Sequence, residues 1–178
     1  MRLFELGGDT QADYLSITVQ DHGETVISTV DAAARNAHLN IEADGHVEFD
    51  NCAVGFDLLE PAHDEINTLV DFRLGNKQLV TFDGDGDGNI DVLRMYFPAT
   101  SGNFTLLVKQ DGTGSRTIGA YRVYESDGTS ADGESEVKWA GGAAPDLTDD
   151  PNHVDILSFF WDKDNEIAYG VATLDFQF

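Results

Sequence analysis

Several kinds of feature are missing from this sequence. It has a single cysteine, Cys52, so an internal disulfide and a cysteine-based zinc cluster are both excluded. A transmembrane helix needs about 18 consecutive apolar residues, and no segment of the sequence approaches that length. No basic stretch leads into an apolar run at the N-terminus, so no signal peptide is expected. The five histidines show no metal-binding spacing, and neither a nucleophile elbow nor a P-loop occurs, so the motifs predict no enzyme.

Basic residues are also scarce. Lys and Arg number 10 against 33 Asp and Glu, which gives a formal net charge of −23 at pH 7. Such a surface repels phosphate backbones and anionic headgroups, so we expect neither nucleic acid nor membrane as a partner. Repulsion among the acids also opposes a compact fold, unless cations bind or salt screens it over a Debye length of roughly 3 Å at 1 M. The low lysine content and the excess of Asp over Glu resemble halophile proteins. The milder alternative is an acidic marine protein.

The apolar residues, 41% of the chain, follow strand patterns. Only residues 30–37 look helical, whereas alternating or β-branched runs separated by Gly, Asn and Asp turns recur along the sequence. This pattern predicts an all-β fold, an antiparallel β-sandwich or barrel-like domain with short strands and little helix. No fixed-period repeat is visible. The predicted strands are 14–20, 24–30, 38–43, 46–56, 66–74, 78–82, 90–97, 104–110, 117–124, 154–161 and 167–178.

Two portions are expected. Pro61 interrupts the stretch LLEPAHDE (58–65), which favours a joint between a β-rich N-terminal portion, 1–75, and a C-terminal β domain, 76–178. The polar, acidic segment 124–136 is predicted to be an exposed loop.

Four blocks in the last half of the chain form a pattern. They are SGNFTLLVKQDGTGSRTI (101–118), VKWAGGAAPDLT (137–148), VDILSFFWD (154–162) and AYGV (168–171). In this order they resemble a C-terminal β domain widespread in tailed-phage virion proteins, of the tail-fibre and head-decoration type. The resemblance supplies no catalytic residue. The residues that carry it include Gln110, Gly112, Gly114, Trp139, Gly141, Gly142, Pro145, Asp155, Phe159 and Phe160.

These motif residues have structural explanations. Gly112 and Gly114 allow a positive φ in the turn after Gln110. Trp139 is expected to cap the core beside the glycine pair that follows it, where backbone can approach an aromatic face. Adjacent residues of a strand point to opposite faces, so Phe159 and Phe160 cannot both face one core. The outward one must meet a second sheet or a neighbouring subunit, which indicates an oligomer.

The sequence departs from that family in two places, the long segment 119–136 and the turn DGDGDGN. The turn matches the start of an EF-hand-type loop, because alternating aspartates can curl around a cation where glycines permit a tight bend. Arg94 stands where the bidentate acid would be, and no helices flank the loop. We therefore weigh a Ca²⁺ or other cation site against a solvated acidic turn. The candidate ligands are Asp83, Asp85, Asp87, Asn89 and Asp91.

The resemblance implies a structural protein of a tailed virus, located in the virion. It would be a capsid decoration, turret or spike, or a short tail-fibre or baseplate element. It would assemble with itself, a trimer being the first expectation, and with other virion proteins. The alternative is a receptor-binding module for a host surface glycan or S-layer, with Tyr121 and Tyr124 stacking on sugars rather than completing strand packing. A small carbohydrate-active hydrolase is the least supported alternative.

Overall fold

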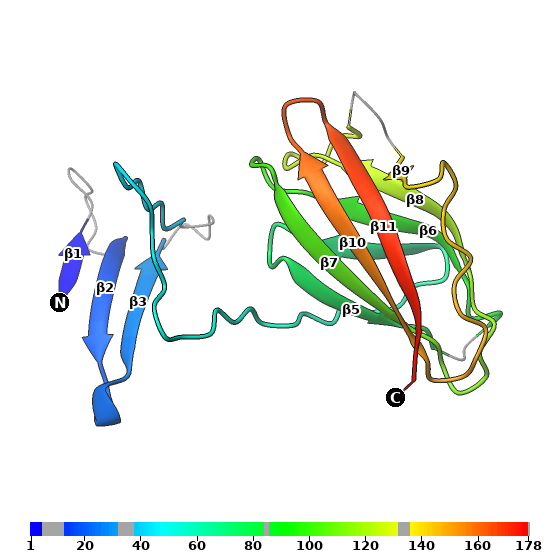
Figure 1. The fold of residues 1–178 in the computed structure, drawn as a ribbon, viewed down its shortest axis with the longest axis horizontal. Coiled ribbons are helices and arrows are strands. Elements are labelled where there is room, and N and C mark those ends of the chain that lie inside the picture. The colour runs from blue at the N-terminus through cyan, green and yellow to red at the C-terminus, as the bar shows by residue number, and fades with distance from the viewer. Residues whose placement is uncertain (5–12, 32–37, 84–85, 132–135, 178) are drawn as a thin grey trace. The chain divides into compact units, whose positions relative to one another are not determined.

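The computed structural model describes residues 1–4, 13–31, 38–83, 86–131 and 136–177. The chain divides into two compact units, Met1–Ala53 and Val54–Phe178, so the division falls before the predicted boundary at residue 75 (Figure 1). The all-β prediction is confirmed, since the described residues contain only one short 3-10 turn, Asp21–Gly23, besides strands. No helix in this part of the chain is long and apolar enough to cross a membrane.

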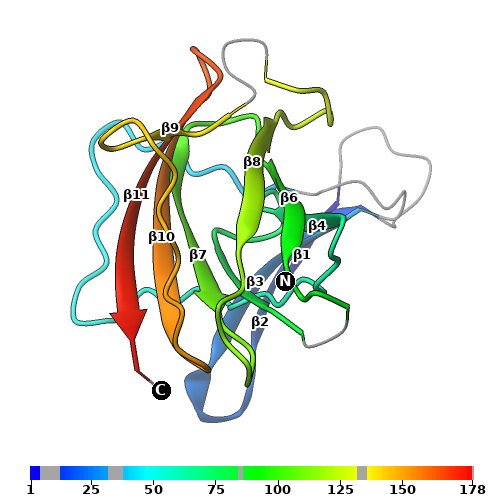
Figure 2. The ribbon, with the colours of Figure 1, turned by 90° about the vertical axis from the view of Figure 1, so that its right-hand side faces the viewer.

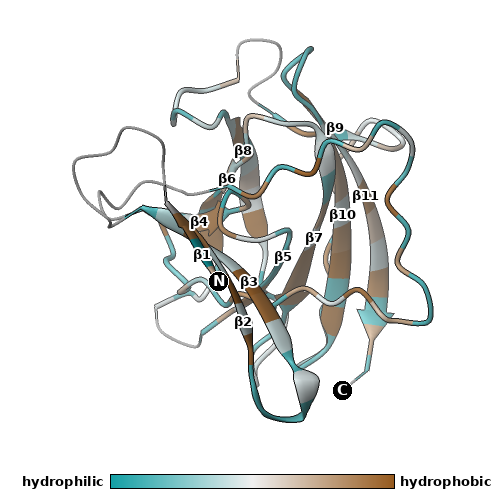
Figure 3. Cartoon of the chain, turned by 90° about the vertical axis from the view of Figure 1, so that its left-hand side faces the viewer, coloured by the Kyte–Doolittle hydropathy of each residue, from teal (hydrophilic) through white to brown (hydrophobic). Residues whose placement is uncertain are grey.

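The N-terminal unit contains one antiparallel sheet with the strand order β1-β2-β3. Its strands are β1 (Arg2–Phe4), β2 (Tyr14–Val19) and β3 (Thr25–Val30). Hydrophobic residues colour much of β2 and β3 in Figure 3. None of the described residues of this unit is buried.

The strands predicted at 38–43 and 46–56 do not form, and that prediction is wrong. The segment has the period-2 alternation of a strand, but none of its described residues joins a ladder. Leu39, Ile41 and Phe49 are 52%, 61% and 64% exposed. Alternation gives a segment one apolar face, whereas a strand also needs a neighbour for its backbone hydrogen bonds.

The C-terminal unit consists of two facing sheets, which Figure 2 separates clearly. One has the order β5-β7-β10-β11-β9 and the other β4-β6-β8. Their strands are β4 (Asn67–Asp71), β5 (Lys77–Thr81), β6 (Ile90–Tyr96), β7 (Gly102–Lys109), β8 (Ile118–Tyr124), β9 (Lys138–Trp139), β10 (Val154–Asp162) and β11 (Ile167–Phe176).

From β4 to β8 the chain alternates between the two sheets, and strands that neighbour one another within each sheet run parallel. This winding is a β-solenoid of about 4 turns, which the antiparallel pairs β7–β10 and β10–β11 extend. The prediction of an antiparallel sandwich or barrel is therefore wrong. The same alternation suits both arrangements, and turns that look like hairpins in the sequence carry the chain across to the opposite sheet.

The prediction that no fixed-period repeat occurs is wrong, because a repeat becomes visible in the register. Val80 pairs with Val108, and Ile90 pairs with Ile118. The number of residues from Val80 to Ile90 is therefore the same as the number from Val108 to Ile118. The described residues of the corner 82–89 therefore stack on the corner 110–117. Because the DGDGDGN turn lies in the first and QDGTGSR in the second, the two motifs are equivalent corners of successive turns.

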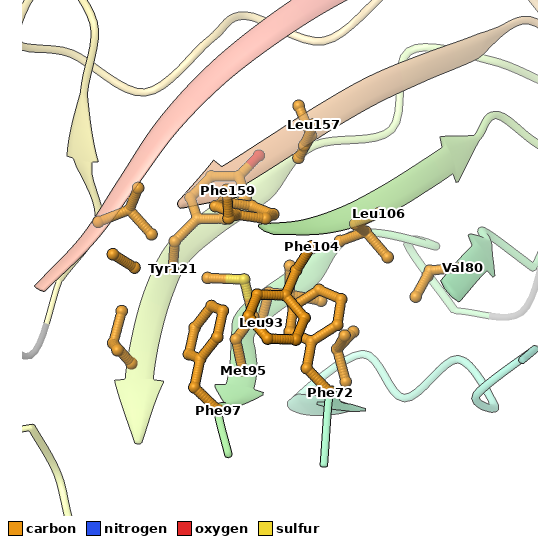
Figure 4. Close-up of a cluster of buried hydrophobic side chains, with 14 of the residues drawn as sticks. Phe72, Val80, Leu93, Met95, Phe97, Phe104, Leu106, Tyr121, Leu157 and Phe159 are labelled. Carbon is orange, nitrogen blue, oxygen red and sulfur yellow. The ribbon is translucent and has the colours of Figure 1, made fainter. Parts of the chain in front are cut away.

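The core of the unit lies between the two sheets (Figure 4). Phe72, Phe97, Phe104 and Phe159 form its centre, with ring centroids 5.1–6.3 Å apart. Trp161 stacks on Phe97 at 4.9 Å and donates its indole N–H to the Pro98 carbonyl. This core fixes which faces of the strands point outward.

Candidate functional site

The outward face of the larger sheet is the first candidate site. Phe159 is 2% exposed and its neighbour Phe160 is 47% exposed, so the prediction that they point to opposite faces is confirmed. Tyr169 and Val171, which alternate outward along β11, are 46% and 53% exposed. The register pairs Phe160 with Tyr169, so their side chains lie on the same face.

These residues line a shallow hollow of about 880 Å³. Its other lining residues include Asn103 and Thr105 on β7, Ile167 on β11 and Lys138 on β9. An apolar patch this open on an acidic protein is typical of an interaction site.

The charge of this face differs from that of the whole chain. Three of the four lysines, Lys77, Lys109 and Lys138, stand on its strands at outward positions. Asp162 has the single carboxylate among the outward positions of β5, β7 and β10 and those of β11 before Leu174. Contacts made through this face therefore avoid most of the repulsion that the net charge of −23 produces elsewhere.

The turn after Gln110 is held by polar contacts. The Gln110 amide donates to the Arg116 carbonyl and accepts from the Arg116 N–H, both at 2.9 Å. Gly114 has the expected positive φ, 78°, and a Cβ there would lie 2.3 Å from the Asp149 carbonyl. The same expectation for Gly112 is wrong, because the positive φ next to Gly114 belongs to Ser115.

Trp139 packs against the core, as expected, but its glycine partner is a different one. A Cβ on Gly170 of β11 would lie 2.7 Å from the Trp139 ring, whereas a Cβ on Gly141 or Gly142 would meet no atom within 4 Å beyond the adjacent residues. That pair instead takes positive φ values, 85° and 87°, in the turn that follows the tryptophan. The register pairs Gly170 with Trp139, a long-range contact that the sequence did not indicate.

Asp155 is a buried anchor, 1% exposed. Its carboxylate accepts from the Thr148 N–H at 2.8 Å, from the Thr148 hydroxyl at 2.7 Å and from the Asp175 N–H at 3.0 Å. These bonds fasten the segment that contains the half-buried Pro145 to β10 and β11. The role is structural, because the described hydrogen bonds of the carboxylate all hold segments of this chain.

In the DGDGDGN turn, the candidate ligands have partners within the protein. The Asp83 carboxylate lies 3.0 Å from His63 Nδ1. Asp87 accepts the Asn89 N–H at 2.9 Å, and the Asn89 side chain accepts the Thr117 N–H at 2.8 Å. Asp91 is exposed at the start of β6, and Asp85 lies outside the described residues.

Two side chains from outside this turn hydrogen-bond to backbone groups of the turn. Glu65 accepts the Gly88 N–H at 3.2 Å, and the Arg116 guanidinium donates to the Asp87 carbonyl. The positive charge of Arg116 thus lies at the acidic turn, where a bound cation would otherwise neutralise the carboxylates. These contacts favour an acidic solenoid corner, and a cation at the turn stays a prediction.

The same guanidinium bridges the two stacked corners. Arg116 Nε and Nη2 lie 2.9 and 2.8 Å from one carboxylate oxygen of Asp111, and both side chains are nearly buried. Arg116 holds the pKa of Asp111 below its usual value, and the N–H groups of Gly114 and Thr113 lower it further. The sequence analysis missed the Asp111–Arg116 pair, which lies within one corner, and the contact of Arg116 with Asp87 depends on the stacking of the two corners.

The two candidate glycan-binding tyrosines lie in different environments. Tyr121 belongs to the core, 6% exposed, and burial raises its pKa, with a further contribution from Asp155. Tyr124 is half-buried and stacks on Tyr96, the equivalent residue of the preceding turn, at 4.7 Å and 10°. Arg94 lies 5.9 Å from the Tyr124 ring centroid. Of the two, only Tyr124 reaches the surface.

One group of possible metal ligands was missed in the sequence. Asp150, His153 and Asp175 bring ligand atoms within 4.8 Å of one another, and His153 Nδ1 lies 2.7 Å from Asp175. Asp150 and His153 are close in sequence, and the pairing of β10 with β11 brings the distant Asp175 to them at one end of the sheet. Exposed acidic groups of this kind are common without a metal.

Comparisons with known proteins give no relative for this chain: no family model, no curated protein and no solved structure matches it.

Proposed function

We propose that this chain is a structural subunit displayed on the particle of a tailed virus, and that it acts by assembling with copies of itself. The observation that carries the assembly role is the outward face of the larger sheet, which β5, β7, β10, β11 and β9 form. It combines exposed Phe160, Tyr169 and Val171 with three lysines and one carboxylate.

Assembly is the use that best fits the physics of this face. Each of the three apolar side chains still has about half of its surface in water. Covering that surface contributes about 2 kcal/mol for each side chain, before the entropy cost of association. In a solution of strongly acidic copies, a face poor in carboxylates is where contact costs least. The hollow on this face is shallow and open, which fits a protein partner better than a small substrate.

The viral assignment is supported by the four sequence blocks between 101 and 171. It is also supported by the consecutive residues Phe159 and Phe160, which lie in the third block. A small subunit builds a large surface only through symmetry, and a trimer is the first expectation. The halophilic composition favours a virus of a salt-requiring host.

The assembly is tested by light scattering after size exclusion in molar salt, because salt screens the acids. The wild type should have a mass that is a multiple of 19.4 kDa, and Phe160→Glu should lower it. Leu69→Glu is the matched control, since Leu69 is 46% exposed on the opposite sheet. A monomeric wild type, or equal effects of both variants, would overturn the assembly role.

The viral location needs a separate test. Antibody raised against residues 119–136 should label particles of the virus whose genome encodes this chain. Gold over the head would mean a decoration or turret, and gold at the tail tip would mean a fibre or baseplate element. Particles without label would overturn the virion assignment.

A second candidate function, receptor binding, is favoured by the stacked pair Tyr96–Tyr124 beside the loop that follows β8. A flat, partly exposed aromatic pair next to Arg94 suits an acidic sugar. Shortening residues 124–136 should abolish retention on host glycan, and unchanged retention would remove this candidate.

A further inference from the structure

The N-terminal sheet has one face that is apolar and uncharged. The register pairs Leu3 with Leu15 and Ile17 with Ile27, and the N-terminal Met1 exchanges backbone hydrogen bonds with Ile17. Because paired residues lie on the same side of a sheet, these side chains share one face with their alternate neighbours. The strand-borne residues of this face are Leu3, Leu15, Ile17, Val19, Thr25, Ile27 and Thr29.

The opposite face is different. There Arg2 lies over the Tyr14 ring at 4.7 Å, and Ser16 and Ser28 share a hydrogen bond of 2.7 Å across β2 and β3. Val26 belongs to this face, immediately before Ile27 on the same strand. Tyr14 and Val30 also lie on this face, so it mixes apolar, polar and charged residues, whereas the strand-borne residues of the first face include no charged one.

The apolar face remains in contact with solvent. Leu3, Val19 and Ile27 are 53%, 69% and 53% exposed, and no described residue of Met1–Ala53 is buried. A three-stranded sheet is stable in water when its hydrophobic face packs against another layer. Among the described residues of this unit, that layer is missing.

We propose that this face packs against the same face of a second copy of the chain, so that two N-terminal sheets form the two layers of a small sandwich. The charge pattern points to a second copy. None of the strand-borne residues of the face is ionisable, in a chain with 33 acidic residues. Two copies can therefore stack without bringing carboxylates together, as an isologous contact requires.

The contact is small. Three strands spaced about 4.8 Å apart and at most about 20 Å long cover on the order of 300 Å² per copy, against the roughly 800 Å² of a typical stable interface. The contact by itself should thus depend on protein concentration, and joining it to a second contact in the same chain should strengthen it.

This inference deepens the proposed function, because it adds a second surface through which copies associate, and it uses different residues. Ile27→Glu in the full-length chain should lower the mass measured by light scattering in molar salt over a concentration series. Val26→Glu should leave it unchanged, since that side chain points to the opposite face. Equal masses for Ile27→Glu and wild type, or equal losses in both variants, would overturn the inference.

Chemical cross-linking provides a readout that does not depend on an added charge. With Cys52→Ser as background, Ile27→Cys should be joined between copies by a short bismaleimide several-fold more than Val26→Cys. Equal cross-linking at both positions would contradict the stacking.

The two proposals fail in different ways. If Phe160→Glu lowers the mass and Ile27→Glu does not, the C-terminal contact stands and the N-terminal stacking is wrong. If only Ile27→Glu lowers it, the stacking stands and the C-terminal contact is wrong. A wild type that is monomeric at every concentration overturns both.

Discussion

Arg116→Met should destabilise the C-terminal unit by removing the counterion of a nearly buried carboxylate. The side chains of Arg116 and Asp111 are 14% and 8% exposed, so water replaces the guanidinium at Asp111 only in part. Removing one partner of such a pair costs about 3 kcal/mol, because the other charge stays buried. The variant also loses the contact that Arg116 makes with the Asp87 carbonyl of the stacked corner.

The effect should be visible in thermal unfolding. For a domain of this size, about 3 kcal/mol corresponds to a fall in Tm of roughly 10 °C. Arg122→Met is the control. Its partner is Glu136, and the side chains are 38% and 64% exposed, so that pair should contribute about 1 kcal/mol or less. Equal losses of Tm in the two variants would refute the reasoning.

The pH dependence gives a second check. The pKa of Asp111 is lowered in the folded protein, so the stability it contributes is fully present above its unfolded pKa of 3.8 and is lost as pH falls towards the folded pKa. The difference in Tm between wild type and Arg116→Met should therefore be full at neutral pH and shrink below about pH 4. A difference that grows on acidification would contradict the assignment of the stabilising pair.

Three further predictions concern packing and charge. Phe159→Ala should cost about 3–5 kcal/mol in denaturant unfolding, whereas Phe160→Ala should cost less than about 1 kcal/mol, and similar values would contradict their placement on opposite faces. Gly170→Ala should cost about 1–3 kcal/mol because its Cβ would meet Trp139, whereas Gly112→Ala should be nearly neutral, so an equal cost would refute the clash. The Tm should rise between about 0.1 M and molar salt as the carboxylates are screened, and a constant Tm would remove the halophilic interpretation.

Part of the candidate site was predictable because it depends on strand alternation alone. Phe159 and Phe160 are neighbours in an apolar run, so one had to face outward whichever sheet the strand joined. The turn residues were less predictable. Glycine permits a positive φ without requiring it, and for this reason Gly114 matched the expectation while Gly112 did not.

The repeat was present in the sequence at a constant spacing, since Leu79, Val80 and Ile90 recur as Leu107, Val108 and Ile118. It was missed because the identical positions are interrupted. Arg94 and Arg122 pair in the ladder, as do Tyr96 and Tyr124, but residues of other types stand between them. Similar Asp-Gly motifs at equivalent corners were the available signal, since each corner needs residues that tolerate tight bends.

The sequence by itself determined the all-β composition, the positions of most strands in the C-terminal unit and the acidity of the surface, because these follow from side-chain type and a period of two. Only the tertiary structure decided that the strands stack in parallel turns, that Arg116 reaches Asp87, and that three lysines share a face with Phe160. Those features depend on which strands become neighbours. Pairing between strands is set by long-range packing, about which local alternation carries no information.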